Sequence, residues 1–149
     1  MPDLSIIILN WNTRELLVKC LKSIFANAPQ CEFEVIVVDN NSDEDITDAV
    51  AQFEGVRLIR NDYNYGFAAG NNIGYRESIG RYVMPLNPDT LIYPETIDRL
   101  LRELETDTSV AIAEHVRSET GLPVSTLGSS LGVAAAYRAI HSDAIVGAI

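Results

Sequence analysis

Short apolar runs alternate with amphipathic segments along most of the chain. Runs of four to six residues that read as buried strands are SIIIL (5–9), FEVIVV (33–38), VRLIR (56–60), RYVMPL (81–86) and VAIA (110–113). Between them, apolar residues recur at i, i+3, i+4 and i+7, as on the buried face of a helix. The three helical sets are Leu17, Cys20, Leu21 and Ile24; Ile46, Ala49, Val50 and Phe53; and Ile97, Leu100, Leu101 and Leu104. Alternating strands and helices predict a three-layer α/β fold with a mainly parallel sheet and flanking helices.

Residues typical of helix ends and turns lie between these strands and helices. Ser42 and Asp45 have the spacing of a capping box for the second helix, and Gly55 stands where that helix should stop. Pro94 is expected to open the last helix. The pattern weakens after Ala113, so we predict an α/β domain over residues 1–113 and an incomplete continuation or tail over 114–149. Within the latter, ETGLPV (119–124) reads as a turn between short strands.

Composition narrows the functional classes. With 149 residues the chain suits one domain, and its net charge of −10 argues against nucleic acid as a partner. The two cysteines have no metal-ligand spacing, and Cys20 lies on a helical stripe, so buried free thiols and a cytoplasmic location are expected. The N-terminus resembles neither a signal peptide nor a membrane span.

Four successive strands each end in a polar cluster. The clusters are Asn10-Trp11-Asn12, Asp39-Asn40-Asn41-Ser42, Asn61-Asp62-Tyr63-Asn64 and Asn87-Pro88-Asp89-Thr90. Each one alone is ordinary loop chemistry. Because ligands of open α/β sheets bind at the carboxyl ends of the strands, the four clusters together predict a site at that edge.

Individual residues of these clusters allow two interpretations. Trp11 either stacks on a base or covers a pocket, or it is a core residue at a helix edge. Asp39 accepts hydrogen bonds from a ribose or a base, or serves as the carboxylate of an Asx turn, and its position at a strand end favours the former. Asp89 is the single carboxylate of its cluster, and one carboxylate suffices for Mg²⁺ or Mn²⁺ when phosphates complete the shell.

Glycines recur at every fourth position in YGFAAGNNIG, at Gly66, Gly70 and Gly74. The spacing does not match a dinucleotide-binding fingerprint. Either the glycines let a helix lie close to the sheet, or the helix start offers backbone N–H groups to an anion, with Asn71 and Asn72 adding amide donors.

Four segments, in order, resemble family 2 glycosyltransferases of the GT-A fold, a Rossmann-like architecture. They are SIIILNWN, FEVIVVDNNSDEDI, NDYNYGFAAGNNIGYRES and YVMPLNPDTLI. The rhamnosyltransferase-like branch is most similar, since Asn-Pro-Asp replaces the DxD motif. The resemblance covers Leu4 to Leu104 strongly and extends weakly to Gly128.

The resemblance implies a site for a nucleotide-sugar donor. Leu9, Asn10 and Trp11 would line the nucleobase pocket, and Asp39 would contact base or ribose. The residues near the diphosphate or sugar would be Asn61, Gly66, Phe67, Asn71 and Asn72. Asn87 and Asp89 occupy positions of the DxD-type motif, with Asp89 as ligand of Mg²⁺ or Mn²⁺.

The implied reaction is transfer of a sugar, from dTDP-rhamnose or a UDP-sugar, to a glycan or lipid-linked acceptor with inversion. Polysaccharide biosynthesis at the inner face of the membrane, with peripheral membrane contact, would fit. Nothing after Asp107 matches the acceptor half of the family, so no catalytic base is assigned and a truncated chain is expected. The alternative is a nucleotide-sugar-binding fragment without turnover. An incomplete sheet would also expose an edge for self-association.

Overall fold

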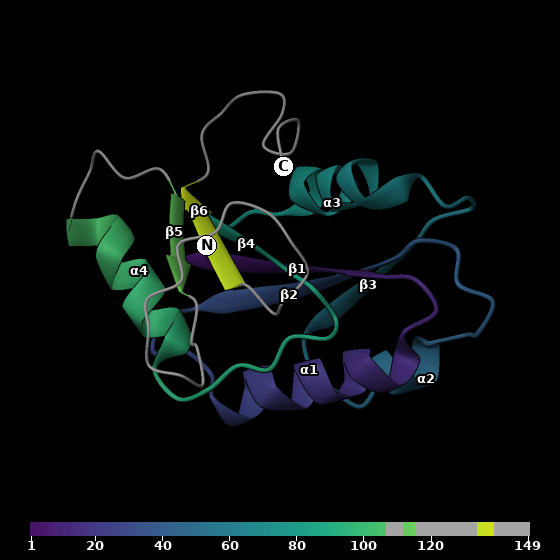
Figure 1. Cartoon of the computed structure of the whole chain (residues 1–149), viewed down its shortest axis with the longest axis horizontal. Helices are drawn as coiled ribbons and strands as arrows, with labels where there is room; N and C mark the ends of the chain where they lie inside the picture. The colour runs from purple at the N-terminus through teal and green to yellow at the C-terminus, as the bar shows by residue number, and fades with distance from the viewer. Residues whose placement is uncertain (107–111, 116–133, 139–149) are drawn as a thin grey trace.

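The computed structural model describes residues 1–106, 112–115 and 134–138, which form one six-stranded sheet with helices on both faces (Figure 1). The strand order is β3-β2-β1-β4-β6-β5. The strands are β1 (Leu4–Asn10), β2 (Phe33–Asp39), β3 (Val56–Arg60), β4 (Tyr82–Leu86), β5 (Ile112–His115) and β6 (Ala134–Arg138). The pairings among β1, β2, β3 and β4 are parallel, whereas β6 pairs antiparallel with β4 and β5. The predicted α/β class with a mainly parallel sheet is confirmed.

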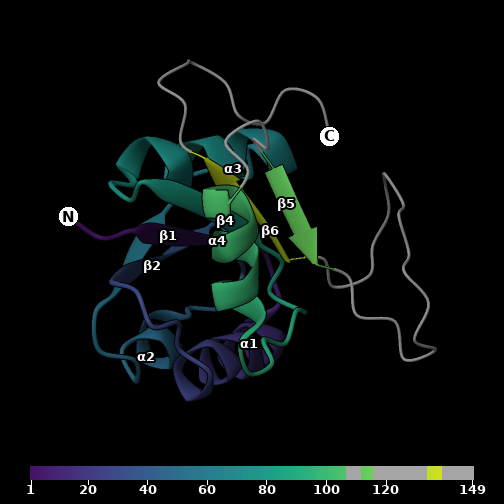
Figure 2. The same cartoon turned by 90° about the vertical axis from the view of Figure 1, so that its left-hand side faces the viewer.

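Alternate residues of β1 face the two layers of helices. Leu4, Ile6 and Ile8 belong to the larger core cluster, together with buried residues of α1, α4 and the segment around α2. Ile7 belongs to a smaller cluster on the opposite face, which half-buried Leu9 also joins. Helix α3 covers this second face, while α1 and α2 lie across the sheet from it (Figures 1 and 2). The sheet is therefore buried on both sides, which explains why its strands read as continuous apolar runs.

The helices are α1 (Arg14–Ala26), α2 (Thr47–Val50), α3 (Gly66–Glu77) and α4 (Thr96–Thr106). The first and last follow the predicted stripes, because the four apolar residues of each set are buried. Helix α4 begins two residues after Pro94, and Glu95 between them has a positive φ of 62°. Pro94 therefore precedes the helix instead of opening it.

The second predicted helix is much shorter than expected. Helix α2 has four residues, so the prediction that it extends to Gly55 is wrong. The capping box is also wrong: Ser42 bonds to Asp39 and Asn12, while Asp45 Oδ1 accepts from the N–H and the hydroxyl of Thr47, at 2.8 and 2.6 Å. Gly55, with φ of 81°, lies in the turn before β3.

The boundary expected after Ala113 falls inside β5, and β6 joins the same sheet. The fifth apolar run overlaps β5 at two residues. Val110, Ala111 and the ETGLPV segment lie outside the described residues. Within the described ranges, no helix is long and apolar enough to cross a membrane.

Candidate functional site

Four polar clusters lie at one end of the sheet. In the parallel register, Asn10 of β1 is opposite Asp39 of β2, and Asp39 is opposite Arg60 of β3. Strand β4 lies on the other side of β1 and runs in the same direction, so Asn87 to Thr90 follow at that end as well. The loops after β1, β2 and β3 gather at the right of Figure 1. We call this edge, with its four polar clusters, the polar rim.

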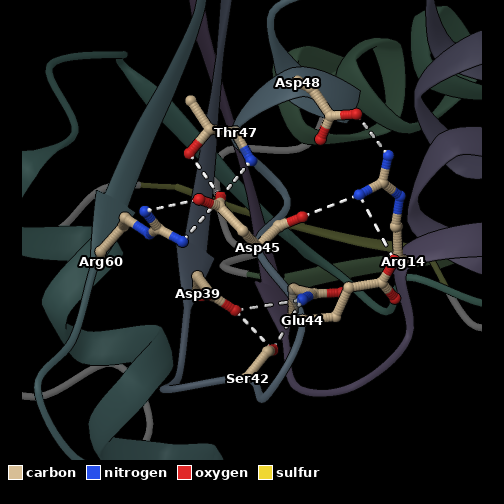
Figure 3. Close-up of polar contacts among 9 residues, drawn as sticks. Arg14, Asp39, Ser42, Glu44, Asp45, Thr47, Asp48 and Arg60 are labelled. Atoms are coloured by element: carbon tan, nitrogen blue, oxygen red, sulfur yellow. Dashed lines mark hydrogen bonds and ion pairs between the residues drawn. The ribbon is translucent and has the colours of Figure 1, made fainter.

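Asp39 ends β2 and is held by two neighbours. It is 3% exposed, and its Oδ1 accepts hydrogen bonds from Ser42 Oγ at 2.5 Å and from Asn10 Nδ2 at 3.1 Å (Figure 3 labels Asp39 and Ser42). Asn10 is fully buried, and its Oδ1 accepts from Thr13 Oγ at 2.8 Å. Asp39 thus accepts from the Ser42 side chain, whereas an Asx turn would use the backbone N–H two residues on, and it lies at the predicted site edge.

Asn40 ties the loop that follows β3 to the end of β2. Its Nδ2 donates to Asn64 Oδ1 at 2.7 Å and to the Gly66 carbonyl at 3.4 Å. Its Oδ1 accepts from Asn61 Nδ2 at 2.9 Å and from the Tyr65 N–H at 3.2 Å. Asn61 is thus positioned through Asn40, as the predicted site requires. Asn64 Oδ1 also accepts from the Gly66 N–H at 2.9 Å, at the start of α3.

Helix α3 lies against the sheet through two of its glycines. A Cβ atom at Gly70 would come within 2.5 Å of Leu9 Cδ1, and one at Gly74 within 2.5 Å of Ile7 Cγ2. The close-packing interpretation of the glycine repeat is therefore confirmed for Gly70 and Gly74. Gly66 differs, because it has space around it and a φ of 80°. The half-buried Leu9 packs its side chain under α3, and its part in the predicted site stays a prediction.

The asparagines of α3 lie in its middle. Asn71 is buried, and its Nδ2 donates to the Phe67 carbonyl one turn earlier, at 3.0 Å. Asn72 Oδ1 is buried and has no hydrogen-bond partner among the described residues. Binding of an anion by either residue stays a prediction.

Aromatic side chains stand exposed around the polar rim. Trp11 and Phe67 are each 55% exposed, so the alternative that placed Trp11 in the core at a helix edge is wrong. Tyr65 is also exposed, and its hydroxyl donates to Asp62 Oδ1 at 2.7 Å, which raises the pKa of Tyr65. Flat, exposed rings at the mouth of a site can stack on a base.

Asp89 differs from Asp39 in its surroundings. It is exposed, and it makes no hydrogen bond or ion pair within the described part of the chain. Its negative charge still acts nearby: burial, and then the charge of Asp89, raise the pKa of the Cys20 thiol to about 12. The thiol lies 3.8 Å from the Asn87 carbonyl oxygen, which also accepts from the Thr90 N–H at 3.0 Å. These contacts brace the loop that carries Asp89.

A divalent cation would have one carboxylate at this point of the site. Residues 1–106, 112–115 and 134–138 contain no group of three His, Cys, Asp or Glu side chains able to hold a metal. A site of Asp89, water and ligand phosphates is the arrangement that Mg²⁺ commonly adopts. The unengaged carboxylate of Asp89 fits that arrangement.

Two arginines hold the acidic segment 43–48 beside the polar rim (Figure 3). Arg14 donates to Asp48 Oδ2 at 2.6 Å and to the Asp45 carbonyl at 2.7 Å, while Arg60 donates to Asp45 Oδ1 at 2.7 Å. Hydrogen bonds from Thr47, and then Arg60, lower the pKa of Asp45, and the bond from Arg14 lowers that of Asp48. Specific hydrogen bonds and ion pairs to Arg14 and Arg60 therefore hold the acidic segment in place.

Sequence reasoning missed the residues that hold the polar rim together, chiefly Asn40, Ser42 and Asn64. All three belong to the polar clusters, where each taken alone is typical of a loop or, for Ser42, of a helix cap. The signal in the sequence is the polar run that begins with Asp39 at the end of β2 and continues to Asp45, because a buried strand end must satisfy its polar groups locally.

The chain matches the family model described as "Glycosyl transferase family 2" over residues 5–140. An uncharacterised glycosyltransferase of Haemophilus influenzae is 30% identical over 112 residues, which cover 75% of this chain and 38% of that protein. The low-salt glycan biosynthesis hexosyltransferase Agl10 of Haloferax volcanii is 29% identical over 128 residues, 83% of this chain and 40% of that protein. The chain thus spans two fifths or less of the length of these relatives.

Solved structures share the fold. The mannosyltransferase PcManGT from Pyrobaculum calidifontis, in complex with GDP-Man and Mn²⁺, superposes with a TM-score of 0.78 and 21% identity over 92% of this chain and 44% of that one. S. aureus TarS 1-349 in complex with UDP-GlcNAc gives a TM-score of 0.66 and 21% identity over 74% of this chain and 33% of that one. The sheet and its helices are those of the GT-A fold. The match of the family model over most of the chain places this protein in glycosyl transferase family 2.

Proposed function

We propose that the polar rim binds the nucleotide-sugar donor of a glycosyltransferase. The donor would be dTDP-rhamnose or a UDP-sugar, and the sugar would pass with inversion to a glycan or lipid-linked acceptor. One observation carries the proposal: the carboxyl ends of β1 to β4 bring a held carboxylate, Asp39, and an unengaged one, Asp89, to a common edge with exposed Trp11. Family membership supports the same reaction class.

The residue roles follow from position along the rim. Asp39 would accept a hydrogen bond from the base or the ribose, and the ring of Trp11 would lie beside that group. Asn10 and the backbone of Leu9 would support Asp39 and Trp11. Asn61 and the Gly66–Phe67 turn would border the nucleotide, because Asn40 holds that loop against β2. Asn71 and Asn72 would lie near the diphosphate or the sugar.

Asp89, with Asn87 shaping its loop, would hold Mg²⁺ or Mn²⁺. When bound, such an ion would offset the negative charge that grows on the departing nucleoside diphosphate. Two structural neighbours support this donor chemistry, since one is in complex with GDP-Man and Mn²⁺ and the other with UDP-GlcNAc. Asp89 is the residue of this chain that would make donor binding metal-dependent.

Transfer itself needs a base that deprotonates the acceptor hydroxyl, and the attack must come from the face opposite the leaving group to give inversion. No residue of the polar rim is assigned that role. A nucleotide-sugar-binding module without turnover is the second candidate, because the polar rim offers groups for donor binding and no assigned base. An assay for donor hydrolysis and for transfer to an acceptor mixture distinguishes the two.

The setting would be the reducing cytoplasm, at the inner face of the membrane where lipid-linked acceptors are found. Both cysteines are free thiols, which supports a reducing compartment. The predicted self-association would use the side of the sheet formed by its last strands, where β5 is the edge strand of the described sheet. Sedimentation velocity would detect dimers, and a purely monomeric protein would argue against that route.

Calorimetry with UDP and dTDP, with and without Mn²⁺, tests the donor site. We expect wild-type protein to bind one of them at least tenfold more tightly with Mn²⁺, and Asp89→Asn to lose about that factor, since one carboxylate–metal contact is removed. Glu103→Gln is the control, because it neutralises an exposed carboxylate on α4, outside the polar rim. Equal metal-dependent binding by Asp89→Asn would remove the role assigned to Asp89; no nucleotide binding by wild type would refute the donor site.

A further inference from the structure

Ser42 has a hydroxyl that is fully engaged between the ends of β1 and β2. It donates to Asp39 Oδ1 at 2.5 Å and accepts from Asn10 Nδ2 at 3.1 Å and from the Asn12 N–H at 2.9 Å. A hydroxyl offers one proton and two lone pairs, so these three bonds use all of its capacity. Any other rotamer of Ser42 would lose them together.

The bonds decide which oxygen of Asp39 remains available. Asn10 Nδ2 donates to the same Oδ1 at 3.1 Å, which completes a triangle of Asn10, Asp39 and Ser42. Oδ2 accepts no hydrogen bond from the described part of the chain. Because Asp39 is almost fully buried, the triangle fixes the carboxylate plane and leaves Oδ2 as the acceptor for a ligand.

The third bond of Ser42 reaches the chain next to Trp11. Asn12 has a φ of 54°, a left-handed conformation that non-glycine residues seldom adopt. The Ser42 bond to its N–H and a reciprocal pair with Asp43, at 2.8 and 3.1 Å, hold Asn12 in that conformation. This third bond, like the pair with Asp43, therefore acts on the backbone at Asn12 and not on the Asp39 carboxylate.

We propose that Ser42 is a positioning residue for the nucleoside part of the donor, orienting the Asp39 carboxylate through its hydroxyl. This inference rests on the proposed donor site. Ser42 itself would not touch the donor: its proton and lone pairs are already used inside the protein. Its effect on affinity should therefore pass through Asp39.

The test is a double-mutant cycle measured by calorimetry with UDP and Mn²⁺, or with dTDP if wild type prefers it. Ser42→Ala should weaken binding about tenfold, the typical loss for one hydrogen bond to a charged group. Asp39→Asn should weaken it at least as much. Ser42→Ala added to Asp39→Asn should change affinity by less than about twofold, because coupled residues are non-additive. Ser42→Thr, which keeps the hydroxyl, should restore most of the affinity.

Asp43→Ala is the matched control. It removes the Asn12 Nδ2 contact from the same loop without touching Asp39, so nucleotide affinity should stay within about twofold of wild type. If Ser42→Ala does not fold, as judged by circular dichroism, Ser42→Cys keeps the size but donates weakly and takes its place.

The outcomes separate the inference from the proposed function. Wild type that binds nucleotide while Ser42→Ala binds equally well refutes the role of Ser42 alone. Additive losses in the double mutant, no recovery in Ser42→Thr, or an equal loss in Asp43→Ala would refute it too. Wild type that binds neither UDP nor dTDP refutes the donor site, and the role of Ser42 with it.

Discussion

Asn40 satisfies every hydrogen-bonding group of its side chain while being 2% exposed. Its amide nitrogen donates to Asn64 and to Gly66, and its amide oxygen accepts from Asn61 and Tyr65. All four partners lie between the end of β3 and the first residue of α3. Only an amide can do this, because a carboxylate of the same shape has no N–H to donate. The identity of this one side chain therefore sets the position of the whole loop against β2.

Asn40→Asp should destabilise the fold and loosen this loop. Its carboxylate would face Asn64 Oδ1 and the Gly66 carbonyl with no proton between them, at a cost of about 2 kcal/mol or more in the free energy of unfolding. Urea denaturation measures this cost. Asn41→Asp is the matched control, since Asn41 is exposed with a φ of 65° that Asp also tolerates, and it should change stability by less than about 0.5 kcal/mol. Equal stability of the two variants would contradict the role of Asn40.

At the scale of elements, the position of α3 depends on two of its residues that have no side chain. Gly70 and Gly74 lie one turn apart and let the helix axis approach β1 more closely than any side chain would allow. The contacts differ in stiffness. Gly70 faces the end of the Leu9 side chain, which can rotate, whereas Gly74 faces Ile7 Cγ2 at 2.5 Å and Val38 Cγ2 at 3.0 Å, both on β-branched residues of buried strands.

Gly74→Ala should therefore cost more stability than Gly70→Ala. Overpacking at Gly74 costs about 1–3 kcal/mol, which exceeds the roughly 1 kcal/mol that alanine gains over glycine in a helix. Thermal and urea unfolding of both variants give the comparison. Arg76→Ala, an exposed substitution on the same helix, should stay within about 0.5 kcal/mol of wild type. A Gly74→Ala protein more stable than wild type would show that α3 does not need this close approach.

Helix α2 shows how a correct pattern leads to a wrong element. Ile46, Ala49 and Val50 are buried as the helical stripe predicts, and half-buried Phe53 stacks on Phe25 with ring centroids 5.6 Å apart. The backbone nevertheless leaves the helix after Val50. The apolar spacing indicates only which residues face the core. Here a short helix followed by a turn buries the same residues, and the ring contact between Phe53 and Phe25 replaces the last helical turn.

At the scale of the whole molecule, the sheet separates two cores of unequal size. The larger core includes Cys20, a residue of α1 that faces the loop after β4 and is fully buried. Burial and the charge of Asp89 raise its pKa from 9.0 to about 12. A thiol with a raised pKa stays neutral and unreactive in the native protein at neutral pH.

The free energy of unfolding should consequently fall as pH rises from about 9 to 12. Below pH 9 the Cys20 thiol is protonated in both states, and its contribution is fully present; between the two pKa values only the unfolded state loses the proton, so the contribution is lost. Urea unfolding across this range measures it in Cys31→Ser protein, which removes the second titrating thiol. Adding Cys20→Ala should flatten the decline relative to Cys31→Ser alone, and an unchanged slope would contradict a buried neutral thiol.

The sequence by itself determined the class of the fold, the direction of β1 to β4 and the edge where their polar clusters meet. Apolar period and strand length depend on local burial, which the order of residues encodes directly. It also placed Asp39 and Asp89 at that edge. It could not tell that Asp39 is held by Ser42 and Asn10 while Asp89 is unengaged.

Only the tertiary structure decided how the polar side chains divide between holding the rim and facing a ligand. Asn10, Asn40 and Ser42 are polar residues of ordinary loop type, and most of their partners lie more than twenty residues away in the chain. The exceptions are the bonds from Ser42 to Asp39 and from Thr13 to Asn10, each between residues three positions apart. The long-range hydrogen bonds depend on strand register and loop path, which no local pattern carries. The segment RYVMPLNPDTLIY (81–93) is a further example. Its sequence predicts only a buried strand that ends in a turn, whereas the parallel pairing of β4 with β1 brings that turn to the polar rim.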